Sequence, residues 1–115
     1  MSKPRSYKYT GTKGHIVDVA TNLPQNGQGL LSQGWIDITD PRQAAIGSFT
    51  YKEPSTGLRI RYDSPEPAAS GFAGKDHFHI LNPNATGTRD MYLDSQGNPV
   101  PKNSKASHIL PKGDK

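Results

Sequence analysis

Two histidines separated by one residue are the strongest candidates for chemistry in this sequence. They are His77 and His79, and within residues 75–81 they alternate with the apolar residues Phe78 and Ile80. Successive side chains of a β-strand point to opposite faces, so burial of the apolar residues leaves both imidazoles on the other face. Imidazole titrates near neutral pH, so such a pair can accept one proton and donate another.

Cleavage of RNA needs this pair of proton transfers. A base removes the proton of the ribose 2′-hydroxyl, an acid protonates the departing 5′ oxygen, and cations stabilise the charge on the phosphoryl oxygens. The candidate cations are Arg59, Arg61 and Lys75. If the segment that contains both arginines pairs with the histidine strand in one antiparallel sheet, Arg59 and Arg61 can share the exposed face with the imidazoles.

Three further side chains are candidates for the same site. His108 follows Ser107 near the C-terminus and reaches this face if a last strand joins the sheet. Asp76 points to the other side of the strand or lies at its end, where it can orient a partner or support the fold. His15 is a weaker fourth histidine.

Spacing alone leaves three interpretations of the histidine pair open. The two residues can be a solvated surface pair, an acid–base site, or two ligands of a metal ion whose other ligands lie elsewhere. The alternating arginines are also typical of a sheet face that is simply exposed to solvent.

A β-hairpin is the clearest local prediction. Two alternating segments, 48–53 and 58–63, flank a Pro/Gly turn at 54–57. In the second segment Leu58, Ile60 and Tyr62 point one way, and the two arginines point the other way together with Asp63. The hairpin therefore has an apolar face and a basic face. Residues 64–74 then predict a loop, and 75–81 predict a third strand.

The segments before the hairpin predict short elements. Residues 15–20 suggest a short strand, 22–29 a loop, and 30–35 one helical turn that ends at Gly34 and brings Trp35 to the core. Asp40 followed by Pro41 has the form of a helix N-cap and a first helical residue, which predicts a short helix over 42–46.

The segments after the third strand predict a loop and edge strands. Residues 82–87 interrupt the strand, and 90–94 form another strand that enters a tight turn. Val100 begins the strand that follows this turn. It lies between two prolines, which are typical of an edge strand. Residues 107–110 predict a last short strand.

Composition indicates one small domain. The chain has 115 residues, of which 31% are hydrophobic, with 12 glycines and 10 prolines, so its core must be assembled from short apolar segments. We expect a flexible basic arm at 1–14, a single domain at 15–110 and a basic tail at 111–115. The expected fold is α+β and β-rich, with short N-terminal helical segments before a twisted antiparallel sheet of about four to six strands.

Charge and residue usage narrow the class of protein. Lys and Arg number 14 against 10 Asp and Glu, and the net charge of +4 favours a polyanionic partner such as nucleic acid. The absence of cysteine excludes disulfides, thiolate metal sites and cysteine nucleophiles. We expect no membrane-spanning segment and no secretory signal, so the chain, if exported, travels as part of a larger protein.

Five short motifs follow one another in the second half of the chain. They lie at residues 74–79, 82–87, 90–94, 97–102 and 107–108. Together they resemble one toxic-tip family of the bacterial polymorphic toxins, whose tips end contact-dependent growth inhibition and Rhs-type proteins. The resemblance extends more weakly to 30–35 and 59–63, and the first 29 residues lie outside it.

The resemblance implies a nuclease that is secreted or displayed on a cell surface as the tip of a larger protein. Such a tip acts in the cytoplasm of the target cell, and a cognate immunity protein neutralises it in the producer. Apart from the immunity complex it is expected to be monomeric. Many such tips are similar to the barnase, EndoU, colicin and RelE group of metal-independent ribonucleases, so no cofactor is expected.

The resemblance also implies a set of polar site residues. By position they are Lys75, Asp76, His77, His79, Asn82, Thr86 and His108. Asn82 and Thr86 can contact phosphate or a base through neutral hydrogen bonds, or can shape their loop. Phe78 stands where the family has tyrosine, so no phenolic role is expected there.

The sequence therefore predicts an endoribonuclease toxin that cleaves tRNA or ribosomal RNA by acid–base chemistry. The predicted catalytic residues are His77, His79, His108 and Asp76. The predicted RNA-binding residues are Lys75, Arg59, Arg61, Asn82 and Thr86. The alternatives are a metal-dependent DNase toxin that uses the His77 and His79 pair, and a non-enzymatic module that binds nucleic acid or a protein.

Overall fold

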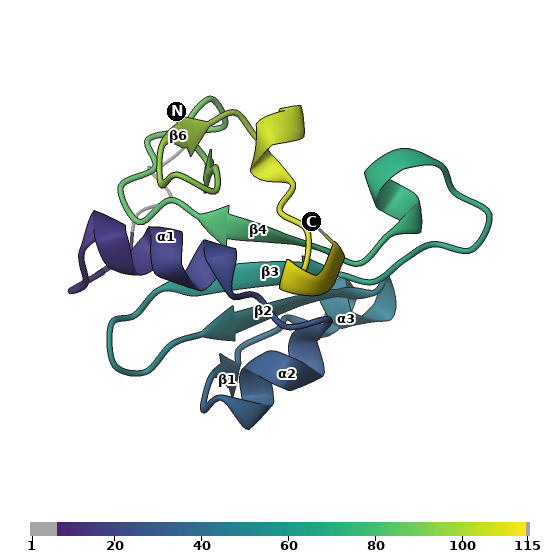
Figure 1. Cartoon of the computed structure of the whole chain (residues 1–115), viewed down its shortest axis with the longest axis horizontal. Coiled ribbons are helices and arrows are strands. Elements are labelled where there is room, and N and C mark those ends of the chain that lie inside the picture. Colours follow the sequence, from purple (N-terminus) through teal and green to yellow (C-terminus); the bar gives the residue numbers. More distant parts are fainter. Residues whose placement is uncertain (1–6, 115) are drawn as a thin grey trace.

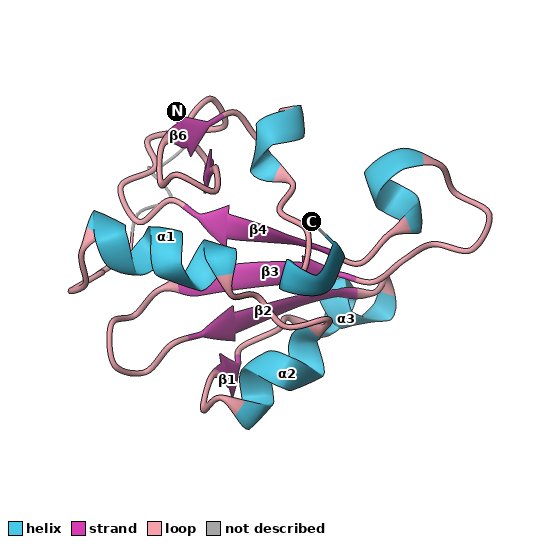
Figure 2. Ribbon diagram, viewed as in Figure 1, coloured by secondary structure: helices cyan, strands magenta, loops and turns pink. Residues whose placement is uncertain are grey.

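The computed structural model describes residues 7–114 and has a six-stranded antiparallel sheet whose strand order follows the sequence (Figures 1 and 2). The strands are β1 (Ile36–Asp37), β2 (Ser48–Lys52), β3 (Arg59–Asp63), β4 (His77–Leu81), β5 (Tyr92–Leu93) and β6 (Pro99–Val100). The helices are α1 (Lys13–Thr21), α2 (Gly27–Ser32) and α3 (Pro41–Ala45), with 3₁₀ turns η1 (Gly71–Gly74), η2 (Lys105–Ser107) and η3 (Lys112–Asp114). The predicted α+β class is confirmed.

Strand register puts the histidines and the basic residues on one face. The predicted hairpin is formed by β2 and β3, and β4 pairs with β3 on its other side. Tyr62 lies opposite Phe78, and Arg61 lies opposite His79. Directly paired residues of an antiparallel sheet point to the same face, so one face carries the aromatic pair and the other carries Arg61 and His79.

The core lies between the apolar face of the sheet and the helices α1 and α2, which lie in front of the sheet in Figure 1. The helical layer and its loops contribute Ile16, Ala20, Leu23, Leu30 and Trp35, and the central strands contribute Ile60, Tyr62, Phe78 and Ile80. Burial of this face leaves the opposite face of β3 and β4 free to carry polar side chains. The prediction that Trp35 belongs to the core is confirmed.

The predicted strand at 15–20 is wrong, because these residues belong to helix α1. The Thr12 side chain accepts a hydrogen bond from the His15 backbone N–H at 3.0 Å and caps the first helical turn. Ile16 and Ala20 are four residues apart and both are buried, which is the spacing of one helix face.

Helix α2 begins earlier than predicted. The Asn26 side chain accepts from the Gln28 N–H at 3.1 Å, so the helix starts at Gly27, inside the predicted loop at 22–29. The predicted end is confirmed by Gly34, whose φ of +93° stops the helical path.

Helix α3 was correctly predicted, and it lies behind the sheet in Figure 1. The Asp40 carboxylate accepts from the Arg42 N–H at 2.7 Å, and Pro41 is the first helical residue. Thr50 Oγ1 donates to Gln43 Oε1 at 3.3 Å, and Thr50 is paired with Arg61. Helix α3 therefore borders the face of the sheet that carries Arg61.

Within the stretch 1–14, predicted as a flexible basic arm, Tyr7 contacts the sheet, and residues 1–6 lie outside the described residues. The Tyr7 hydroxyl donates to the Leu81 carbonyl at 2.7 Å and accepts from the Arg59 N–H at 3.1 Å.

Among the described residues, no helix is long and apolar enough to cross a membrane.

The predicted last strand at 107–110 is reduced to a single bridge. Ile109 and Phe78 exchange two backbone hydrogen bonds of 2.8 Å each, next to the 3₁₀ turn η2. Ile109 is buried in the core cluster, so the residue before it faces the other side of the sheet.

Replacement of Phe78 by alanine tests this core. Phe78 is fully buried and its ring centre lies 5.1 Å from that of Tyr62, so we expect Phe78→Ala to lower the free energy of unfolding by about 3–5 kcal/mol. Urea denaturation followed by circular dichroism measures the loss. Phe49→Ala, at a partly buried position of the same cluster, should cost less; equal losses would contradict the assigned packing.

Candidate active site

Three histidines form one cluster on the sheet face opposite α1 and α2. His77 and His79 lie side by side with ring centres 5.1 Å apart, and only 5% and 2% of their surfaces are exposed. The ring centre of His108 lies 5.2 Å from that of His77 and 4.7 Å from that of His79. One ring nitrogen of each residue lies within 4.8 Å of the others.

The bridge between β4 and the C-terminal segment explains why His108 joins the pair. In an antiparallel pairing of Phe78 with Ile109, the residue before Ile109 becomes the neighbour of the residue after Phe78. These residues are His108 and His79. The sequence predicts this approach on the condition that a last strand joins the sheet, and the single bridge is sufficient.

The Asp63 carboxylate is the centre of the polar contacts. Its Oδ2 atom lies 2.9 Å from Arg61 Nη2, 3.1 Å from His77 Nε2 and 3.5 Å from His79 Nε2, and its Oδ1 accepts from Ser48 Oγ at 2.9 Å. Burial opposes its ionisation, but the hydrogen bonds to the two histidines and the Arg61 charge outweigh burial. They hold the pKa of Asp63 well below its ordinary value.

His77 is arranged as an imidazolium. Its Nδ1 lies 3.1 Å from the Lys75 carbonyl oxygen, which can only accept, and its Nε2 lies beside the Asp63 carboxylate. Both ring nitrogens therefore face acceptors. Burial works against the charge, but Asp63 and the Lys75 carbonyl outweigh it and raise the pKa of His77 above its ordinary value.

His79 is arranged as a neutral imidazole. Burial lowers the pKa of His79, and the Asp63 carboxylate offsets this only in part, since the charges of Arg61 and His77 add to the lowering. Its Nε2 faces Asp63, whereas its buried Nδ1 has no hydrogen-bond partner among residues 7–114. One nitrogen is thus oriented by the protein, and the other is buried without a hydrogen bond to any described residue.

His108, like His79, has one ring nitrogen that is held by the protein and one that has no hydrogen-bond partner among the described residues. Its Nδ1 lies 3.0 Å from the Ser104 carbonyl oxygen, so Nδ1 carries a proton and donates it. No side chain or backbone group of the described residues is hydrogen-bonded to its Nε2. The ring is half-buried and stacks on Phe72, with ring centres 4.5 Å apart.

Arg61 lies between two hollows on this face. Its Nη1 donates to the Tyr92 hydroxyl at 2.6 Å, and Tyr92 in turn stacks on His79 with ring centres 4.7 Å apart. One hollow, of about 270 Å³, is lined by Arg61, Asp63 and His77 among others, and the second, of about 210 Å³, by Arg61, Tyr92 and Lys102 among others. Gln43 of α3 lines both hollows.

Asp76 does not reach the histidines. Its carboxylate accepts hydrogen bonds from the Tyr62 hydroxyl and, at 3.0 Å, from the Gln25 side-chain amide on the helix-covered side of the sheet. These contacts agree with the fold-supporting interpretation that the sequence left open for Asp76, and they place it away from the catalytic position also predicted for it. The carboxylate at the cluster is Asp63, because alternation from β3 places it opposite His77.

The predicted RNA-binding residues are only partly brought together. Arg61 lies at the cluster, whereas Arg59 lies over the Tyr7 ring at 4.7 Å from its centre. The Lys75 side chain is exposed before β4, and its carbonyl is what contacts His77.

Asn82 and Thr86 shape the loop that follows β4. The Asn82 amide donates to the Asp90 carbonyl at 2.8 Å, and its side-chain oxygen accepts from the Asn84 N–H at 3.0 Å. Thr86 Oγ1 donates to the Asp90 carboxylate at 2.8 Å. These contacts support the loop-forming interpretation that the sequence left open for both residues.

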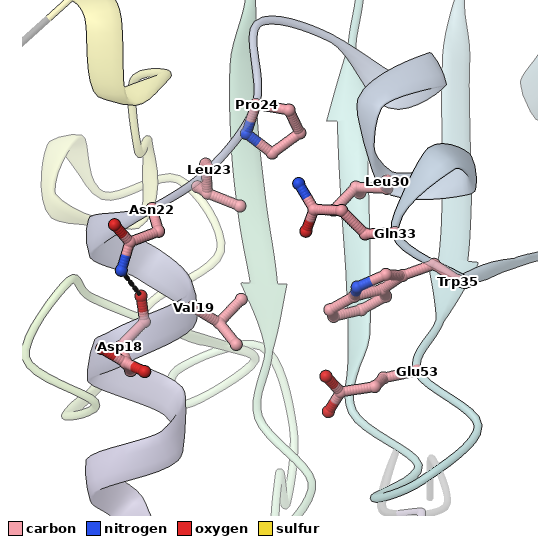
Figure 3. A pocket seen from close by; sticks show the side chains of 9 residues that line it. All are labelled: Asp18, Val19, Asn22, Leu23, Pro24, Leu30, Gln33, Trp35 and Glu53. Carbon is pink, nitrogen blue, oxygen red and sulfur yellow. Dashed lines mark hydrogen bonds between the residues drawn. The ribbon is translucent and has the colours of Figure 1, made fainter.

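A further hollow, of about 150 Å³, lies between α1 and α2 (Figure 3). Trp35 and Glu53 face it, and the side-chain amide of Asn22 donates a hydrogen bond to the Asp18 backbone carbonyl at 2.8 Å. Glu53 accepts a hydrogen bond from Thr56 and lies 2.7 Å from His15 Nε2. His15, the weaker fourth candidate, is therefore paired here and lies outside the cluster.

Sequence reasoning missed three side chains of the site. Asp63 was placed on the correct face but was given no role, although alternation carried the signal. Tyr92 reaches the cluster from the short strand β5 and Phe72 from the 3₁₀ turn η1, and no sequence pattern indicates their contacts. Taken together, the cluster offers two imidazoles beside a guanidinium, each with one ring nitrogen that has no hydrogen-bond partner among the described residues. Such a set is suited to proton transfer at an anionic substrate.

Comparisons with family models, curated proteins and solved structures find no match for this chain.

Replacement of Asp63 by asparagine tests the electrostatics of the cluster. We expect the pKa of His77 to fall in Asp63→Asn, because the imidazolium loses its counter-charge. Titration of the ring signals by NMR measures this change. Asp76→Asn is the matched control, since it removes a carboxylate from the opposite side of the sheet, and an equal fall in that variant would contradict the assignment.

Proposed function

We propose that the chain is an endoribonuclease that cleaves RNA through attack of a ribose 2′-hydroxyl on the adjacent phosphodiester, without a metal cofactor. The observation that carries the proposal is the pair His79 and His108. Each ring has one nitrogen held by the protein and one with no hydrogen-bond partner among the described residues, and the ring centres lie 4.7 Å apart. A neutral imidazole takes the 2′-hydroxyl proton, and a protonated one donates to the departing 5′ oxygen.

The other residues of the cluster have supporting roles. Asp63 orients His79 through Nε2, as carboxylates do for catalytic histidines. Arg61 stabilises charge on the phosphoryl oxygens, and its Nε has no hydrogen-bond partner among the described residues. Both ring nitrogens of His77 face acceptors, which favours its protonated form and so adds positive charge beside Arg61.

In this proposal the two hollows that Arg61 lines receive the anionic strand. A phosphate placed at the guanidinium lies next to both hollows, of which Gln43 lines both and Lys102 lines one. The net charge of +4 supplies attraction to the RNA backbone that does not depend on sequence.

The sequence motifs support a delivered toxin as the setting of this activity. In this proposal the domain is secreted or displayed as the tip of a larger protein and acts on tRNA or ribosomal RNA in the cytoplasm of a target cell. A cognate immunity protein neutralises it in the producer. A partner that covers the two hollows would block the approach of RNA.

A metal-dependent DNase is the second candidate, because three histidine nitrogens converge. Mg²⁺ prefers oxygen ligands, whereas the only carboxylate at the cluster among the described residues is Asp63. Its Oδ2 is already shared by Arg61 and two histidines. The contacts therefore favour the metal-free ribonuclease over a magnesium-dependent nuclease.

Replacement of His79 and of His108 tests the function. We expect His79→Ala and His108→Ala each to lower the rate of RNA cleavage by about 10²–10⁴-fold, because each removes one proton-transfer group. The measurement is cleavage of labelled RNA in EDTA beside a 2′-deoxy strand of the same sequence, which should stay intact. His15→Ala is the matched control and should keep its activity.

Three results would contradict this function. Cleavage of the 2′-deoxy strand would exclude attack by the 2′-hydroxyl. Loss of cleavage in EDTA would favour the metal-dependent nuclease. RNA binding without turnover by the unmodified chain, unchanged in both variants, would favour the non-enzymatic binding module.

A further inference from the structure

The three clustered imidazoles have the donor chemistry of a transition-metal site. Histidine nitrogens are the ligands that Zn²⁺ takes in many protein sites, and three of them suffice for a site with one open position. The ring nitrogens of His77, His79 and His108 lie within 4.8 Å of one another. Because the three residues come from β4 and a segment bridged to it, the backbone holds them together.

The surroundings of two rings match those of metal-binding histidines. A ligating histidine usually donates its other N–H to a carbonyl or carboxylate, which fixes the tautomer and the ring orientation. His77 donates through Nδ1 to the Lys75 carbonyl, and His108 does so to the Ser104 carbonyl. In His108 this leaves Nε2 as the ligand atom. In His77 the ligand atom is also Nε2, which lies 3.1 Å from Asp63 Oδ2, so an ion there takes the place of the proton between them.

The third ring supplies an independent sign of a ligand. His79 is 2% exposed, and its Nδ1 is buried without a hydrogen-bond partner among the described residues. A buried polar atom without a partner costs free energy, which a bound cation or a substrate group recovers.

We propose that His77, His79 and His108 bind one Zn²⁺ ion, and that the bound ion inhibits RNA cleavage. Binding displaces the proton on His77 Nε2, and the cation then replaces that proton as the positive partner of Asp63. A coordinated nitrogen has no lone pair with which to accept a proton and no proton to donate. The inhibitory effect rests on the proposed ribonuclease activity, whereas the metal site does not.

Titration of the tag-free protein with Zn²⁺ tests the site. After removal of metals with EDTA and dialysis, isothermal titration calorimetry should show one ion per chain. Co²⁺ as a spectroscopic probe should give the visible absorption bands of a four- or five-coordinate ion. His108→Ala and the size-conserving His108→Gln should weaken Zn²⁺ binding by roughly 100-fold or more. His15→Ala should bind as tightly as the unmodified chain, and circular dichroism checks that each variant is folded.

Cleavage assays over the same range of Zn²⁺ separate the two parts of the proposal. RNA cleavage should fall in step with the measured occupancy, and EDTA should restore it. Equal Zn²⁺ binding by the unmodified chain and both His108 variants, or no binding at all, would overturn the metal site. Cleavage that requires Zn²⁺ would overturn the inhibitory role and the metal-free mechanism. A chain that binds Zn²⁺ through His108 but cleaves no RNA would overturn the proposed function and the inhibition, and leave the site standing.

Discussion

The contact on which the site depends is the cluster of donors around the Asp63 carboxylate. A partly buried carboxylate is tolerated only when it is paired, and here Arg61 and two histidines supply the partners. The two histidines that share this carboxylate differ in their pKa shifts. Asp63 and the Lys75 carbonyl outweigh burial and raise the pKa of His77, whereas burial lowers the pKa of His79 despite the same carboxylate. Two neighbouring rings are therefore shifted in opposite directions.

The fold positions these groups through the pairing of β4 on both of its sides. On one side β3 brings Arg61 and Asp63 opposite the two histidines. On the other side the single bridge at Ile109 brings His108 next to His79. Burial of Phe78 and Ile109 on the helix-covered face fixes which way all three histidines point. The core and the site are therefore two faces of the same strands, and a shift of register by one residue would exchange them.

Alternation was the part of this arrangement that the sequence could predict. It correctly placed the hairpin, the third strand and the shared face of Arg61 and His79, because each strand has a period of two that is visible locally. Helix α1 was missed because its short apolar run also fits a strand. Asp76 was a candidate because it adjoins the histidines in sequence, whereas the carboxylate that contacts them, Asp63, lies on the neighbouring strand. Tyr92 and Phe72 depend on how short segments and loops pack, for which no local pattern exists.

The nature of the cleaved RNA ends tests the central claim most directly. Attack by a 2′-oxygen forms a bond to the adjacent phosphorus while the bond to the 5′ oxygen breaks. A defined RNA oligonucleotide incubated with the protein and examined by mass spectrometry should therefore yield fragments that end in a 2′,3′-cyclic phosphate, paired with fragments that begin with a 5′-hydroxyl. Fragments that carry a 5′-phosphate and a 3′-hydroxyl would show that water attacks the phosphorus instead, and would contradict the assignment of proton transfer to His79 and His108.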